Sequence, residues 1–146
     1  MSANTLRFEL VDHVLVIVHA DVAPADDDWR RLTVVRNANR SKTRGNLVIA
    51  PPRASINAAQ RADVAAVMKE TGISVAVVTE SALIRGIALA IGFMGVQLRA
   101  FAPSEITSAL NFLLVPSSRH AAVLGAVESL KAQLAVIDKT PSKRFR

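Results

Sequence analysis

Hydroxyl and guanidinium side chains, which can bind anions, follow two apolar segments of this chain, Leu47–Ile49 and Ile73–Val78. The residues concerned are Arg53, Ser55, Thr79, Ser81 and Arg85. Ligands of open α/β sheets settle outside the carboxyl ends of the parallel strands, and a helix that begins there favours negative charge. We therefore predict that these side chains contact an anion or a protein partner. The alternative is that the hydroxyls cap helices and that the arginines are hydrated.

Other site chemistries find little support in the sequence. The three histidines, His13, His19 and His120, lie on separate segments without the spacing of metal ligands. Cysteine is absent, which excludes disulfides, thiolate metal sites and cysteine nucleophiles. Neither glycine-rich nucleotide-binding pattern occurs, and no nucleophile–base pair can be assembled. We therefore expect a protein that is not an enzyme and that has no catalytic residues, metal or cofactor.

The chain is basic, with a net charge of +6 and a pI of about 10.8. This balance permits attraction to nucleic acids, anionic membranes or acidic proteins. The densest basic cluster consists of Arg30, Arg31, Arg36, Arg40, Lys42 and Arg44. A nucleic-acid surface would need stacking aromatic residues beside it, and only Trp29 is near, which we expect in the core. A hydrated helix end is therefore the favoured interpretation, and nucleic acid is an unlikely partner.

The sequence predicts a cytoplasmic protein without a membrane span. Residues Met1 to Thr5 lack the charged and apolar regions of a signal peptide. The longest apolar run, Ile87–Val96, is about half of the roughly 20 residues that a membrane helix needs.

The order of apolar segments predicts an α/β domain over residues 1–115, with a mostly parallel sheet of about five strands. The expected strands are Leu6–Leu10, Val14–Val18, Leu47–Ile49, Ile73–Val78 and Val96–Phe101. The first two should form an antiparallel hairpin, whereas the long connections between the others suit helical crossovers. The expected helices begin at Pro24, at Ile56 after a Ser55 cap, at Ser81 and at Pro103. Three of the strand segments are apolar throughout, apart from Ser74. We therefore expect Val14–Val18, Leu47–Ile49 and Ile73–Val78 to be adjacent, parallel and buried.

An additional helix is expected within residues 116–138, followed by a disordered basic tail over residues 139–146. Its apolar seam, with heptad-like spacing, comprises Val123, Val127, Leu130, Leu134 and Ile137. An isolated helix is only marginally stable in water, so this seam must be covered. Packing onto the chain's own sheet and pairing with a second copy use the same residues, and we favour the homodimer.

Four segments carry a family resemblance: Gly45–Ile49, Ile73–Thr79, Ser81–Ala88 and Val96–Phe101. Together with the element order, they resemble the STAS domain of SpoIIAA-like anti-sigma-factor antagonists, and more closely the STAS/SEC14-like bacterial proteins of unassigned role. The resemblance implies a regulatory module that contacts another protein through residues 53–69. Because SEC14-like relatives enclose lipids, the alternative is a carrier of a small apolar ligand or an anion, which a deep apolar pocket would distinguish.

One departure from the family concerns phosphorylation. STAS antagonists usually have an aspartate at the end of the third strand and a phosphorylatable serine at the start of the next helix. Here Ala50 and Pro51 follow the strand, and Ala58 and Ala59 occupy the helix start. Ser55 lies several residues early, so we expect no phosphorylation switch.

Overall fold

The computed structural model describes residues 4–142, and the side chains of residues 4–135. The strands are β1 (Leu6–Val11), β2 (Val14–His19), β3 (Gly45–Ile49), β4 (Ser74–Val78) and β5 (Leu98–Phe101). The helices are α1 (Asp26–Ala38), α2 (Ala58–Thr71), α3 (Ala82–Gly92), α4 (Ile106–Phe112) and α5 (His120–Ser142). Short 3-10 helices precede α4 and α5, namely η1 (Pro103–Glu105) and η2 (Ser117–Arg119).

The strands form one mixed sheet in the order β1-β2-β3-β4-β5. Strand β1 pairs with β2 antiparallel, and every later pair is parallel. Val16 lies beside Leu47, which lies beside Ala76, so the three apolar segments are adjacent and parallel as predicted. All of β2 is buried, whereas the end of β3 is only half-buried. The predicted α/β architecture is thus confirmed.

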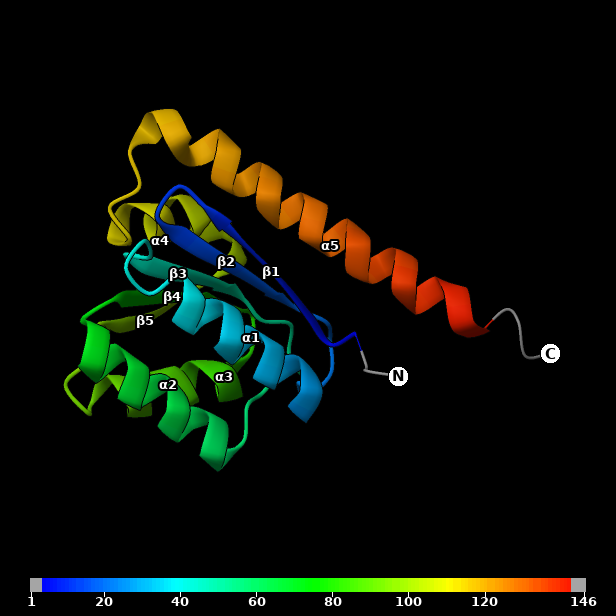
Figure 1. Ribbon diagram of the computed structural model, residues 1–146, viewed down its shortest axis with the longest axis horizontal. Helices are drawn as coiled ribbons and strands as arrows, with labels where there is room; N and C mark the ends of the chain where they lie inside the picture. The colour runs from blue at the N-terminus through cyan, green and yellow to red at the C-terminus, as the bar shows by residue number, and fades with distance from the viewer. Residues whose placement is uncertain (1–3, 143–146) are drawn as a thin grey trace.

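Helices cover both faces of the sheet, with α1, α2 and α3 on one face and α4 and α5 on the other (Figure 1). The strands follow one another in sequence order, and parallel crossovers are right-handed in nearly all proteins. Three successive crossovers in the same direction therefore place their helices on the same face. Helix α4 follows the last strand and turns to the opposite face, where α5 joins it.

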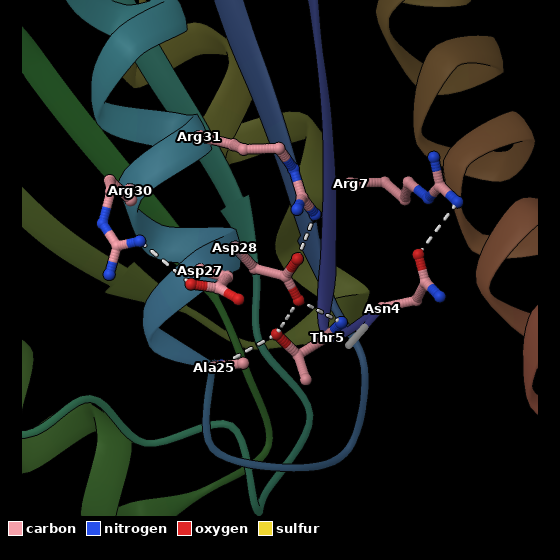
Figure 2. Close-up of polar contacts among 8 residues, drawn as sticks. All are labelled: Asn4, Thr5, Arg7, Ala25, Asp27, Asp28, Arg30 and Arg31. Carbon is pink, nitrogen blue, oxygen red and sulfur yellow. Dashed lines mark hydrogen bonds and ion pairs between the residues drawn. The ribbon is translucent and has the colours of Figure 1, made fainter. Parts of the chain in front are cut away.

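The first turn of α1 is anchored to the start of β1 by a buried aspartate (Figure 2). The Thr5 backbone N–H donates to Asp28 Oδ2 at 2.7 Å, and the Thr5 hydroxyl donates to the same oxygen at 2.5 Å. The Ala25 backbone N–H donates to the Thr5 hydroxyl oxygen at 2.9 Å, and Arg31 pairs with Asp28. Asp28 therefore does more than complement the helix dipole, because it links two elements that are distant in sequence.

Helix α2 begins at Ala58, and its cap is Asn57 rather than Ser55. The Gln60 backbone N–H donates to Asn57 Oδ1 at 2.8 Å, and the Asn57 N–H donates to Gln60 Oε1 at 3.0 Å. This reciprocal capping box needs a Gln or Glu three residues after the cap. Ser55 has Ala58 at that position, so the predicted Ser55 cap was wrong.

Helix α5 packs along β1 and β2 and extends past the end of the sheet (Figure 1). Val123, Val127, Leu130 and Leu134 are buried in a core shared with β2 and α4. The chain's own fold thus covers these four seam residues, while the side chain of Ile137 lies outside the described residues. The homodimer stays a prediction.

The helix also runs four residues beyond the expected end at position 138, to Ser142. Residues 139–142 of the expected tail therefore belong to α5, and residues 143–146 lie outside the described part. Across residues 4–142, no helix combines the length and apolar character needed to cross a membrane.

Candidate functional site

A cavity of about 90 Å³ lies between the sheet and the helices α1, α2 and α3. Its apolar lining includes Ile17, Leu32, Val48, Met68, Val77 and Ile84. Three buried alanines, Ala50, Ala54 and Ala88, also line it. Protein interiors are normally packed without voids larger than a water molecule. The small alanine side chains, at positions where longer ones would fill the gap, account for this space.

Three polar side chains share this apolar lining: His19 at the end of β2, Arg36 near the end of α1 and Asn46 on β3. Each residue is 6 % exposed. Within the described part of the chain, His19 Nδ1, Arg36 Nε and Asn46 Oδ1 lack a hydrogen-bond partner. A buried polar atom without a partner costs about 1–3 kcal/mol. Unpartnered polar atoms on the wall of a cavity therefore suggest a bound molecule that supplies a partner to at least some of them.

The register of the sheet directs two of these side chains into the cavity. Successive side chains of a strand point to opposite faces. On β2, Leu15, Ile17 and His19 thus share the face covered by α1, where Leu15 and Ile17 pack against Leu32. Asn46 lies beside Leu15 in the parallel pair. The alternation of side chains along the strands therefore puts His19 of β2 and Asn46 of β3 on the face of the sheet that α1 covers.

Arg36 and Trp29 are held by one carboxylate. The Trp29 indole Nε1–H donates to Asp63 Oδ2 at 3.0 Å, and Arg36 Nη2 donates to the same oxygen at 2.9 Å. The Arg36 side chain is only 7 % exposed, whereas that of Asp63 is 35 % exposed. Asp63 on α2 thus compensates the buried charge of Arg36 on α1, and it does not engage the Arg36 Nε–H, which has no hydrogen-bond partner among the described residues.

His19 carries no charge at neutral pH. Removal from water by burial lowers the pKa of its imidazole from 6.5 to about 4. With Arg36 neutralised by Asp63, the cavity lining combines an apolar surface with polar groups that carry no net charge.

The predicted anion contacts at the carboxyl edge of the sheet are engaged with their own neighbours. Thr79 is buried, and its hydroxyl oxygen accepts from the Ser81 backbone N–H at 3.1 Å. Ser81 Oγ accepts from the Ile84 N–H at 3.1 Å and caps α3. Arg85 donates to the Glu80 carbonyl at 2.9 Å. These contacts match the capping alternative for Ser81, and they do not direct the three side chains into one pocket.

The two remaining predicted residues lie in the loop before α2. Arg53 is exposed, and its backbone N–H donates to Asp21 Oδ1 at 2.8 Å. Ser55 is half-buried and lines the cavity. Of the five predicted contacts, the structure therefore brings only Ser55 to the site.

Sequence reasoning missed the polar residues of the cavity. Arg36 was assigned to a hydrated basic cluster, which is wrong because α2 covers it and Asp63 pairs with it. The usable signal was the pair of polar residues on buried strands, His19 and Asn46. In residues 4–135, no three His, Cys, Asp or Glu side chains gather in a group that could hold a metal ion.

Comparisons with known proteins found no matching family model, curated protein or solved structure. The STAS resemblance therefore stays a prediction from the sequence, and functional inference depends on the site itself.

Proposed function

We propose that this protein binds a small, largely apolar molecule in the cavity under α1, α2 and α3, as a carrier or ligand-responsive module. The observation that carries this proposal is the apolar cavity with three unpartnered, buried polar groups on its wall. Ligand pockets are typically apolar surfaces with a few placed polar groups. This pocket favours the carrier, which is the alternative function that the family resemblance implies.

Xenon tests the proposal, because it enters apolar cavities irrespective of hydrogen bonding. We expect xenon to shift the amide signals of residues around the cavity in NMR spectra, saturably, in the wild-type protein. Ala88→Leu should abolish these shifts, because Ala88 is buried and lines the cavity. Ala90→Leu is the matched control, since Ala90 lies on the exposed face of the same helix. Absence of saturable xenon shifts in the wild type would refute the proposal.

A second candidate function is a protein-interaction module that docks through the outer face of α3. Helix α3 exposes Leu83 and Leu89, and the turn directly after it exposes Phe93 and Met94, with Phe93 81 % exposed. Clusters of exposed apolar side chains are typical of interaction sites. The surface implied by the family resemblance, residues 53–69, instead exposes mainly alanines and Lys69 on α2, with Arg53 in the loop before it.

Affinity purification with two variants separates the two surfaces. A partner that docks on α3 should be lost with Phe93→Lys and retained with Ala62→Lys, because Ala62 is exposed on α2. Loss of the partner with Ala62→Lys and its retention with Phe93→Lys would instead favour docking on the α2 surface.

A further inference from the structure

We propose that the ligand is uncharged and carries a hydroxyl group, which binds between Asn46 and Arg36 at the amino-terminal end of β3. This inference rests on the proposed function, and it specifies the chemistry of the ligand.

The fold places Asn46 and Arg36 at the same end of the cavity. Thr5, which binds Asp28 at the start of α1, also lies beside the end of β2, because its carbonyl accepts from the Ala20 N–H at 2.8 Å. Helix α1 therefore runs back towards the start of β2, and the eight residue steps from Asp28 to Arg36 rise about 12 Å. Asn46 is at that end, beside Leu15.

His19 lies at the opposite end of the cavity. The parallel register places Val18 beside Ile49, so His19 is about four residues further along the strand direction than Asn46. Four residues of a strand span about 13 Å. A small ligand that binds Asn46 therefore does not reach His19, which contributes to the far wall of the cavity.

The unpartnered atoms at the Asn46 end require a ligand group that both donates and accepts. Arg36 Nε–H is a donor only, and Asn46 Oδ1 is an acceptor only. A hydroxyl accepts from the first and donates to the second. A carboxylate has no proton to donate to Asn46, and a primary amide would bring a second N–H that needs a further acceptor.

The charge of the lining excludes an ionised ligand group. Asp63 already neutralises Arg36 at 2.9 Å, and His19 is neutral at pH 7 because burial lowers its pKa to about 4. A carboxylate would enter this apolar space without a compensating charge, which is costly. The cavity encloses about 90 Å³, so the enclosed part of the ligand consists of only a few non-hydrogen atoms.

Three probes of similar shape test this inference: isobutanol, isobutyramide and isobutyrate. Each is titrated into the 146-residue chain at pH 7, and dissociation constants are measured by NMR. We expect isobutanol to bind the tightest and to shift the Arg36 Nε–H signal, and isobutyrate to produce no saturable shift around the cavity. Tighter binding of the amide or of the carboxylate would overturn the inference.

A fourth probe, isobutanethiol, replaces the hydroxyl with a weakly hydrogen-bonding thiol. In Asn46→Leu, which is similar in shape to the wild-type residue, we expect the preference for isobutanol over the thiol to fall about fivefold, the effect of one lost hydrogen bond. An unchanged preference would overturn the role of Asn46. Since xenon needs no hydrogen bond, xenon binding with no preference for the alcohol refutes this inference alone, whereas absence of xenon binding refutes the proposed function.

Discussion

Acidification should destabilise the protein through His19, because the folded state holds this side chain in its neutral form. Burial lowers its pKa to about 4, whereas an unfolded histidine titrates near 6.5. Between these values the unfolded chain binds a proton that the folded protein does not. The contribution to stability is therefore complete above pH 6.5 and is lost as the pH falls towards 4.

The size of this effect follows from the two pKa values. The full difference between 6.5 and about 4 corresponds to about 3 kcal/mol, at 1.36 kcal/mol for each pH unit. Between pH 7 and pH 5, the linkage relation gives a loss of about 2 kcal/mol in the free energy of unfolding. This range lies above the ordinary pKa values of aspartate and glutamate, so His19 should dominate the slope.

Urea unfolding at pH 7, 6 and 5 measures the loss. In His19→Leu, we expect the pH dependence between 7 and 5 to fall by about 2 kcal/mol, because the titrating group is gone. His13→Gln is the matched control, since His13 is exposed in the β1–β2 turn, and it should keep the wild-type slope. An equal slope in wild type and His19→Leu would refute the reasoning that His19 is buried and neutral.

Three further predictions concern the elements that support the site. Asp28→Asn should lower the free energy of unfolding by about 3 kcal/mol, because it disturbs a buried, charged network, whereas Asp27→Asn at an exposed ion pair should change it by less than about 1 kcal/mol; urea unfolding compares the two. Asn57→Ala should cost about 1 kcal/mol through loss of the α2 cap, and Ser55→Ala should leave the thermal midpoint nearly unchanged; a larger effect at Ser55 would contradict the cap assignment. Leu130→Asp should abolish cooperative unfolding, because Leu130 lies in the chain's own core. If the variant instead stays folded, and light scattering shows a dimer for the wild type and 15.6 kDa for the variant, the predicted homodimer would be supported.

The sequence was sufficient for the strands because their burial is a local property. Val14–Val18 is continuously apolar and Ile73–Val78 is apolar except for Ser74, which is typical of strands covered on both faces. The chain direction and the long connections then determined that these strands run parallel. Boundaries were less accurate: β5 begins at Leu98 rather than Val96, and α2 begins at Ala58 rather than Ile56.

The candidate site was largely invisible in the sequence. Of the five predicted contacts only Ser55 lines the cavity, and Arg36 was taken for a hydrated surface residue. A helix pattern reports which residues share a face, but an arginine at the margin of that face is exposed or buried according to what packs beside it. Arg36 is buried because it packs beside α2, where it pairs with Asp63, a residue 27 positions away.

The sequence by itself thus determined the type and order of the elements, because apolar periodicity and turn residues act within a few positions of the chain. The tertiary structure alone decided which surface covers the seam of α5, where Leu130 packs against the chain's own sheet. It also decided that space remains beside Ala50, Ala54 and Ala88. A cavity is the small difference between the volume that the elements enclose and the volume that their side chains fill, so it depends on all of the packed elements at once.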